Sequence, residues 1–179
     1  GKEPHPQIGM VFQDANMLPW RNLSKNIQLP FEIKGIKPDD ARIENLLERV
    51  GLAGFGQKYP RELSGGMQQR ASIVRALSFD PSVLLMDEPF GALDAFTRDD
   101  MNLLVQEIWL ETKKTIVFIT HNIVEAVFLS DRVHVMSARP GRLAETIDVN
   151  FPRPRTIEML SDPKAIDLVS KIKAKIERT

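Results

Sequence analysis

Two carboxylates at the end of an apolar run are the residues of this sequence best suited to chemistry. The run VLLM at 83–86 is followed directly by Asp87 and Glu88, and then by Pro89. A parallel strand that ends in this way puts both carboxylates at the carboxyl edge of its sheet, where ligands bind in such folds. Asp87 could hold Mg²⁺, which prefers oxygen ligands, and Glu88 could polarise a water as a general base. The alternative is a strand that ends in a solvated acidic turn.

An anion site is predicted at the octet LSGGMQQR, residues 63–70. Ser64, Gly65 and Gly66 would stand at the start of a helix. The backbone amides there are unpaired, the helix dipole is positive, and the missing side chains let a phosphate approach the backbone. For Ser-Gly-Gly taken alone, a plain helix cap is the alternative.

The elements that must position these residues alternate between strand and helix. Apolar runs predict strands at 8–12, 83–86 and 116–119, the last two buried in a parallel sheet. Helical spacing of apolar residues predicts helices at 39–50, 64–77, 94–113, 122–129 and 163–177. The expected apolar stripe of the helix at 94–113 is Phe96, Met101, Val105, Ile108 and Trp109, and that of the helix at 163–177 is Ile166, Val169, Ile172 and Ile176.

The remaining segments are predicted from their turn residues. Residues 14–38 are broken by Pro19, Pro30, Gly35 and Pro38 and are expected to form loop and short helix. The turn RPGR at 139–142 lies between 133–136 and 143–149 and predicts a hairpin. Strands that alternate with helices predict an α/β fold.

Composition excludes several classes of function. Lys plus Arg equals Asp plus Glu at 24 each, so there is no basic excess that would favour a nucleic-acid partner. The absence of cysteine excludes disulfides, thiolate metal sites and cysteine nucleophiles. No apolar run approaches the ~20 residues that span a bilayer. If the protein serves a membrane, we expect it to do so from the aqueous side.

The motifs resemble, in order, those of the ATP-binding-cassette (ABC) ATPases. The octet at 63–70 resembles the signature motif of that family, and 83–89 resembles its Walker B motif with a catalytic glutamate. The segment GALD at 91–94 resembles the D-loop, His121 the switch histidine, and VFQD at 11–14 the Q-loop. MLPWR at 17–21, SARPGR at 137–142 and NFPRPR at 150–155 are similar to the ATPase subunits of nitrate, sulfonate and taurine importers.

This resemblance implies a P-loop NTPase-like parallel sheet core, incomplete here, with a helical signature subdomain. Expected boundaries are 1–13 for the end of a partial RecA-like core, 14–80 for the helical subdomain and 81–179 for the rest of the core. The cofactors would be ATP and Mg²⁺. The expected nucleotide-binding residues are Ser64, Gly65, Gly66, Gln68 and Asp94. The expected catalytic residues are Glu88, His121 and Gln13, and the expected metal ligands are Gln13 and Asp87.

The resemblance also implies a function, partners and a location. The expected function is that of an ATP-binding and ATP-hydrolysing subunit of a bacterial importer, peripheral on the cytoplasmic face of the membrane. Its partners would be a second copy in a homodimer, transmembrane permease subunits and, indirectly, a solute-binding protein, with no nucleic acid. Leu18, Pro19 and Trp20 are the candidate docking surface for the permease, with Trp20 as a buried anchor between lobes as the alternative. The rival functions are a catalytically inactive truncated cassette that acts only as a dimer partner, and a soluble ABC ATPase that acts on DNA or ribosomes.

The phosphate-binding loop of the family, GxxxxGK[ST], does not occur in the sequence. The chain begins at Gly1 and runs at once into a predicted strand, so we expect its natural beginning to be absent, with a processed or tagged terminus as the alternative. On that expectation the chain alone binds ATP very poorly. Its sheet edges and core faces would also be uncovered, which predicts a less stable and aggregation-prone product.

Overall fold

The computed structural model describes residues 8–178, which form two compact units. Unit 1 comprises the chain as far as Met101 together with Thr112–Ile119, and unit 2 comprises Asn102–Glu111 together with the chain from Thr120 onward. Each unit is described by itself. Of the segment expected at 1–13, residues 1–7 lie outside the described part of the chain.

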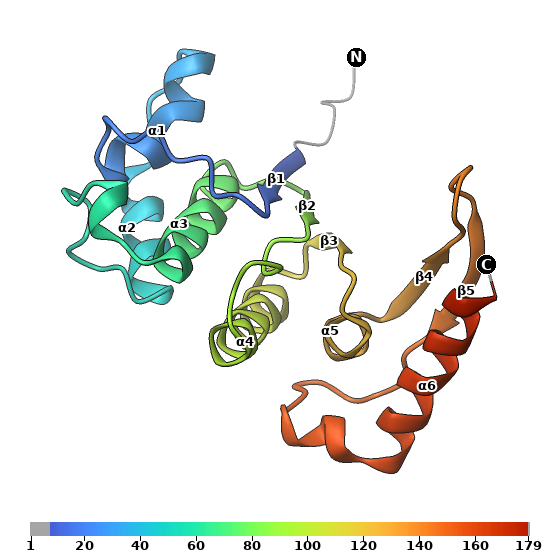
Figure 1. The fold of residues 1–179 in the computed structure, drawn as a ribbon. Coiled ribbons are helices and arrows are strands. Elements are labelled where there is room, and N and C mark those ends of the chain that lie inside the picture. The colour runs from blue at the N-terminus through green and yellow to red at the C-terminus, as the bar shows by residue number, and fades with distance from the viewer. Residues whose placement is uncertain (1–7, 179) are drawn as a thin grey trace. The chain divides into compact units, whose positions relative to one another are not determined.

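Three parallel strands form the sheet of unit 1 (Figure 1). They are β1 (Ile8–Phe12), β2 (Val83–Asp87) and β3 (Thr115–Ile119), with β2 in the centre. The three predicted strands and the parallel sheet are therefore confirmed. Phe12 pairs with Asp87, and Asp87 pairs with Ile119, so the three strands end in register. The residues that follow these strands consequently start from a single edge of the sheet.

The expectation that β2 and β3 are buried on both faces is wrong, since β2 is only half-buried on one face and β3 exposes Val117 and Ile119 there. On one face of the sheet, Leu84 and Met86 of β2 are buried, and an atom added at Gly9 would lie 2.9 Å from the carbonyl oxygen of Ala76 in the helix that covers this face. The opposite face exposes the apolar side chains Ile8, Met10, Phe12, Val117 and Ile119. They share that face because side chains alternate along a strand and the strands are in register. Parallel sheets are usually covered on both faces, and here the described helices of unit 1 cover one.

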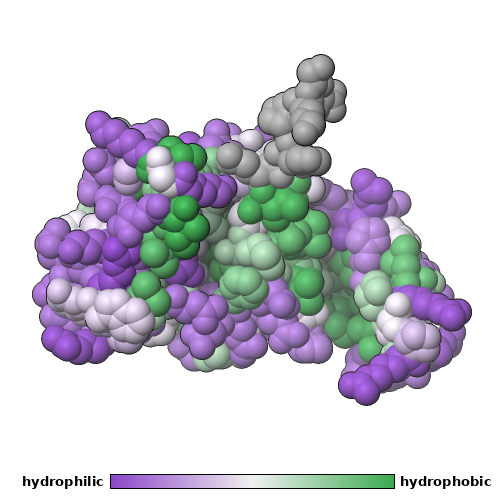
Figure 2. Space-filling view, turned by 90° about the horizontal axis from the view of Figure 1, so that it is seen from above, coloured by the Kyte–Doolittle hydropathy of each residue, from purple (hydrophilic) through white to green (hydrophobic). Residues whose placement is uncertain are grey.

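The space-filling view shows exposed hydrophobic areas among the hydrophilic surface of the molecule (Figure 2). We expect the double substitution Val117→Thr with Ile119→Thr to reduce aggregation of the 179-residue chain and to leave its thermal midpoint nearly unchanged. The two side chains are 47% and 52% exposed, so little buried area is lost, and threonine keeps the β-branched shape that suits a strand. Light scattering at rising protein concentration measures the first effect and a thermal melt the second.

The matched control for this prediction is Leu84→Ala, which truncates a buried side chain on the covered face of the same sheet. It should lower stability by about 2–5 kcal/mol, the usual cost of such a truncation. Aggregation that is unchanged in the double threonine variant would show that the open face is not its cause.

Three helices form a lobe of unit 1 beside this sheet (Figure 1). They are α1 (Leu23–Lys34), α2 (Asp40–Arg49) and α3 (Gly65–Leu77), and a short 3₁₀ turn, η1 (Pro60–Glu62), precedes α3. The predicted helices at 39–50 and 64–77 are confirmed. Asp39 caps α2 by accepting from the backbone amide of Arg42, and Ser64 caps α3 in the same way.

One helix of this lobe is longer than its sequence suggests. Pro30, expected to break the segment 14–38, lies inside α1. Proline removes one helical hydrogen bond, but α1 keeps a buried apolar face at Leu23, Ile27 and Phe31. Packing of that face therefore outweighs the local cost of the proline.

The long helix α4 (Ala95–Thr112) contributes residues to both units. Met101, Val105 and Ile108 of its predicted stripe are buried, whereas Phe96 is 86% exposed, so the stripe is wrong at that position. Phe96 and Met101 are five residues apart, so their side chains point about 140° apart around the helix axis and lie on different faces of α4.

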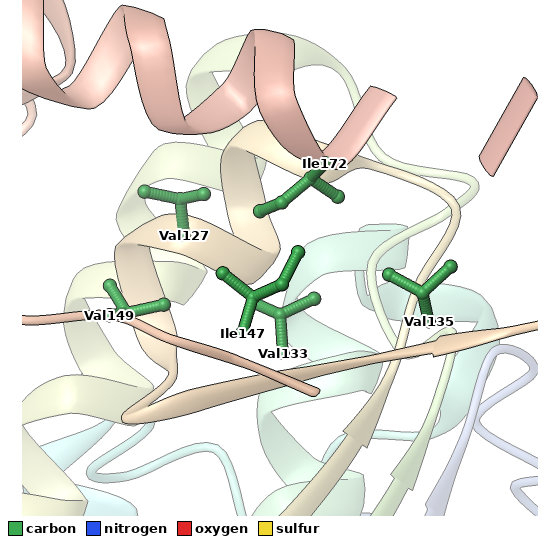
Figure 3. Close-up of a cluster of buried hydrophobic side chains, with 6 residues drawn as sticks. All are labelled: Val127, Val133, Val135, Ile147, Val149 and Ile172. Atoms are coloured by element: carbon green, nitrogen blue, oxygen red, sulfur yellow. The ribbon is translucent and has the colours of Figure 1, made fainter. Parts of the chain in front are cut away.

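Unit 2 is built from a helix, a hairpin and the terminal helix. Its elements are α5 (Ile123–Leu129), the antiparallel strands β4 (Arg132–Met136) and β5 (Leu143–Asp148), the short turn η2 (Glu158–Ser161) and α6 (Pro163–Glu177). The predicted helices and hairpin are confirmed. Figure 3 shows Ile172 of α6 pointing toward the side chains of the hairpin, with Val127 of α5 beside them. Ile166 and Ile176, also expected in the stripe of α6, are exposed, and Ala165 is buried instead.

Candidate functional site

The carboxylates and the amide predicted to act together do lie at one edge of the sheet. Asp87 is the last residue of β2, and Gln13 directly follows β1. Glu88 leaves the strand with a φ of 44°, a left-handed conformation, and its backbone amide donates to the carbonyl oxygen of Ile119 at 2.8 Å. A side-chain atom added at Gly91 would lie 3.2 Å from Nε2 of Gln13. The amide of Gln13 therefore packs against the loop that begins at Glu88.

The metal-ligand predictions can be tested against the donor set. Within residues 8–178, no group of three or more His, Cys, Asp and Glu side chains could hold a metal ion. Gln13 and Asp87 offer one amide oxygen and one carboxylate. This small set suits Mg²⁺, which is held by one or two carboxylates and completes its shell with phosphate oxygens and waters. It does not suit a metal that requires a cage of protein ligands.

A pocket of about 370 Å³ joins the start of α3 to the segment before α4. We call it the signature pocket. Its lining residues are Ser64, Gly65, Gly66, Met67, Arg70, Ala92, Leu93, Asp94 and Thr97. Two motifs that are separate in the sequence, at 63–70 and 91–94, thus share one concave surface.

The two glycines of the signature pocket have different surroundings. A methyl group added at Gly66 would lie 3.0 Å from Cγ2 of Thr97, whereas one added at Gly65 would meet nothing within 4 Å. Gly66 therefore allows α3 to approach α4 closely. No packing reason explains Gly65, so the space that it leaves open is available to a ligand.

Asp94 both caps α4 and lines the signature pocket. Its carboxylate accepts hydrogen bonds from the Thr97 hydroxyl at 2.6 Å and from the Thr97 backbone amide at 3.0 Å. Both bonds lower the pKa of the Asp94 carboxyl, and the bond from the Thr97 hydroxyl contributes most. Asp94 therefore carries a negative charge at neutral pH, and a phosphate at the pocket would have to keep its distance from that side of it.

Gln68 and Arg70 differ from expectation in opposite ways. Gln68 does not line the signature pocket, because its side-chain amide donates to the carbonyl oxygens of Pro60 at 3.0 Å and Leu63 at 3.4 Å. Arg70, the last residue of the octet, lines the pocket and brings a cation to it. The sequence carried that signal, since Arg70 lies four residues after Gly66, about one helical turn, and so on the same side of α3.

His121 lies in unit 2, and its neighbours are fixed by a closed set of hydrogen bonds. The Thr120 hydroxyl donates to Oε1 of Glu125 at 2.7 Å and accepts from the backbone amide of Asn122 at 3.0 Å. Asn122 in turn accepts from the backbone amide of Glu125 at 3.0 Å and so caps α5. The residues on either side of His121 are thereby held in place. Buried Glu125, which the sequence analysis missed, is the centre of this arrangement.

Trp20, in the candidate docking surface, is 72% exposed. The alternative of a buried anchor between lobes is therefore wrong. The neighbouring Arg21 is held by an ion pair with Glu32 of α1 at 2.8 Å.

The sheet, the strand-end carboxylates and the signature pocket define a nucleotide-binding cassette of the P-loop NTPase fold. A solved structure, the ATP-binding cassette MJ0796 in a dimeric post-hydrolysis state bound to ADP and Pi, is similar with a TM-score of 0.66 and 31% identity. The match covers 82% of this chain and 64% of that one. The family profile described as ABC transporter matches residues 1–91. The chain belongs to the ABC transporter family.

Curated relatives agree with this assignment. An uncharacterized ABC transporter ATP-binding protein of Methanocaldococcus jannaschii is 48% identical over 92% of this chain and 64% of its own length. The aliphatic sulfonates import ATP-binding protein SsuB of Bacillus cereus is 44% identical over 86% of this chain and 61% of its own. The taurine import ATP-binding protein TauB of Yersinia pestis is 47% identical over 83% and 59%. The chain thus spans about three fifths of the length of the relatives it matches.

Proposed function

We propose that this chain acts in an ATP-binding and ATP-hydrolysing subunit of an importer of the sulfonate or taurine type. The observation that carries the proposal is the signature pocket, in which the start of α3 and the segment at 91–94 form one surface with open space at Gly65. The names of the sulfonate and taurine relatives support the importer assignment.

The proposed mechanism assigns one task to each residue at the site. When bound, ATP with Mg²⁺ supplies the phosphoryl group that is transferred to water. Asp87 and Gln13 would hold the metal, and Glu88 would take a proton from the attacking water. Phosphoryl transfer needs mainly positioning and charge neutralisation, so the remaining residues act as fixed donors. His121 would supply such a donor to the γ-phosphate.

The signature pocket would act on the nucleotide held by a second copy of the subunit. Ser64, Gly65 and Gly66 would present the unpaired amides of α3 to its phosphate, and Arg70 would add a positive charge. Asp94 would complete the surface from the other side. This arrangement requires two copies that face each other head to tail.

The remaining partners follow from the proposed importer. Leu18, Pro19 and exposed Trp20 would dock a transmembrane permease subunit, and a solute-binding protein would deliver the solute to that permease. The subunit would then lie at the cytoplasmic face of the membrane. In the part of the chain that the structure describes, no helix combines the length and the apolar character needed to cross a membrane.

Gly65→Ala tests the proposal, because it separates ligand binding from folding. The test uses a completed cassette, by which we mean a chain that carries a GxxxxGK[ST] loop ahead of this sequence. Alanine at this helical position has free space and should stabilise the fold by about 0.5–1 kcal/mol. It would also fill the space through which a phosphate approaches the α3 amides. We therefore expect a thermal midpoint that is unchanged or higher, with ATP hydrolysis reduced at least ~10-fold.

The control is Gly35→Ala, at a left-handed position with a φ of 64° after α1, which should lower stability and leave hydrolysis per folded molecule unchanged. If Gly65→Ala hydrolyses ATP at the normal rate, Ser-Gly-Gly is a plain helix cap and the proposed role of the signature pocket is wrong.

A further inference from the structure

One buried amide connects the signature helix to both of the strand ends that carry the candidate catalytic residues. Gln69 of α3 is only 3% exposed. Its Nε2 donates to the carbonyl oxygen of Phe12 at 2.6 Å and to that of Pro89 at 2.6 Å. Phe12 directly precedes Gln13, and Pro89 directly follows Glu88. A single side chain thus holds the backbone next to each of these two residues.

The chemistry of this connection is specific to glutamine. The amide nitrogen carries two hydrogens, and each satisfies one carbonyl oxygen. An apolar side chain of similar length would leave both oxygens without this donor, and an ionised carboxylate would put a third acceptor against them. The backbone of Gln69 carries a further bond, since its carbonyl oxygen accepts from the hydroxyl of buried Ser72 at 2.7 Å.

Gln69 lies on the helix that begins at the signature pocket. It lies on the same helix as Ser64 and Gly65, and five residues of helix span only about 7.5 Å. A helix transmits a displacement of its first turn along its axis as a rigid element. Any shift of α3 that accompanies filling of the pocket would therefore pull on the carbonyls of Phe12 and Pro89.

We propose that Gln69 is a positioning residue that couples the signature pocket to Gln13 and Glu88. When α3 is in the position that engages the nucleotide of a second copy, the two hydrogen bonds of Gln69 hold the ends of β1 and β2 so that the side chains of Gln13 and Glu88 face the nucleotide of their own copy. This inference rests on the proposed function for its catalytic consequence. The mechanical coupling itself involves only residues of unit 1 and does not depend on that function.

Hydrogen–deuterium exchange of the 179-residue chain tests the coupling without nucleotide. In Gln69→Leu we expect the peptides that contain 13–16 and 90–93 to exchange at least ~10-fold faster, while α2 is unchanged. The matched control is Asn26→Leu. Asn26 is likewise a buried amide of unit 1, and it donates to the carbonyls of Leu18, Arg21 and Asn22. Asn26→Leu should speed hydrogen exchange in residues 17–22 and leave exchange in residues 90–93 unchanged. Exchange at 13–16 and 90–93 that is unaffected by Gln69→Leu would overturn the proposal.

Gln69→Glu distinguishes hydrogen bonding from simple filling of space. At pH 8 its ionised carboxylate has no hydrogen to donate, so both segments should open as they do in the leucine variant. At pH 5 a protonated carboxyl can donate to one carbonyl, so protection should partly return after correction for the intrinsic rate of exchange. Protection in Gln69→Glu that is the same at both pH values and equal to that of the parent would contradict the proposed donor role.

Steady-state kinetics of the completed cassette tests the consequence for catalysis. We expect Gln69→Leu to lower kcat about 10–100-fold and to change the KM for ATP less than ~3-fold, because the residue acts on the catalytic geometry and not on nucleotide binding. Glu88→Gln is measured alongside. If Glu88→Gln abolishes hydrolysis while Gln69→Leu keeps a normal kcat, the present inference is wrong and the proposed function stands. If Glu88→Gln is fully active, the proposed role of Glu88 as the base is wrong, and hydrogen exchange alone decides whether Gln69 couples the two segments.

Discussion

Replacement of Glu88 by glutamine in the completed cassette slows ATP hydrolysis about 10²–10⁴-fold and leaves nucleotide binding nearly intact. This is the usual size of the effect when a general base is removed. Glutamine keeps the shape of the side chain and its ability to accept a hydrogen bond, but it cannot take a proton from water. The change therefore tests the chemistry of one oxygen atom.

The backbone at Glu88 makes this substitution a clean one. A φ of 44° is unfavourable for any residue other than glycine by about 1–3 kcal/mol. The surrounding structure holds the conformation through two backbone hydrogen bonds, from the Glu88 amide to Ile119 and from the Gly91 amide to Glu88. Glutamine bears the same strain as glutamate, so folding should not change.

Phosphate release measures the rate, and equilibrium binding of a labelled nucleotide measures affinity. Glu44→Gln, a change of the same kind at an exposed position of α2, is the control and should have no effect. Phosphate release by Glu88→Gln at the rate of the parent would show that Glu88 is not the base.

Replacement of Arg155 by methionine lowers the free energy of unfolding of unit 2 by about 3 kcal/mol, the second large effect that we expect. The guanidinium of Arg155 is buried and donates at 2.7–3.3 Å to the backbone carbonyls of Val127, Phe128, Ser130, Val149 and Phe151. The first three carbonyls end α5, where the helix dipole favours a cation. Methionine keeps much of the apolar stem and leaves all of these oxygens without a donor.

The charge of Arg155 persists under physiological conditions. Burial, with a smaller contribution from Arg153, lowers the pKa of Arg155 to about 10, which is still well above neutral pH. The backbone of the same residue is fixed as well, because Gln106 accepts from its amide at 2.6 Å and donates to its carbonyl at 2.8 Å. Arg155 thus joins α4, α5 and the segment after β5 within unit 2.

Urea unfolding, followed by a probe in unit 2, measures the loss. A slope of about 2 kcal/mol per molar urea converts it to a midpoint lower by roughly 1.5 M. Arg132→Met, at an exposed position of β4, should shift the midpoint by less than a quarter of that. Arg155→Lys should fall between, since a single ammonium cannot reach all five carbonyls. An unchanged midpoint in Arg155→Met would mean that water satisfies the carbonyls without loss of stability, and would contradict the prediction.

Much of the fold could be predicted because particular residues mark where its helices and strands begin and end. Ser64 and Asp39 mark helix starts by their capping side chains, and Gly51 follows the end of α2 with a φ of 75°. Short apolar runs mark the strands, and at 83–86 the run lies between Pro81 and Pro89. These signals are local, so they can be seen without knowing what packs against them.

Burial could not be predicted in the same way. A run such as IVFI at 116–119 is apolar on both faces, and the sequence does not say whether each face is covered. Phe96 illustrates the same point in a helix, since it is apolar and yet almost fully exposed. Each of these errors concerns a non-local property, which depends on what lies next to the side chain and not on its own type.

The candidate site shows the same division. Gln13, Asp87, Glu88 and the glycines of the octet could be found because strand ends and helix starts carry chemistry at fixed offsets. Gln69 and Glu125 could not be found, because they act through hydrogen bonds to residues remote in sequence or to their own turn.

The signature pocket is proposed to engage nucleotide held by a second copy, and ATP-driven dimerisation tests this claim most directly. Sedimentation of the completed cassette carrying Glu88→Gln would be measured with and without ATP and Mg²⁺. We expect a monomer that becomes a dimer when ATP is added, and a monomer under both conditions when Gly65→Ala is added to the same chain. A Gly65→Ala cassette that dimerises with ATP as readily as its parent, or a parent that stays monomeric at saturating ATP, would contradict the account.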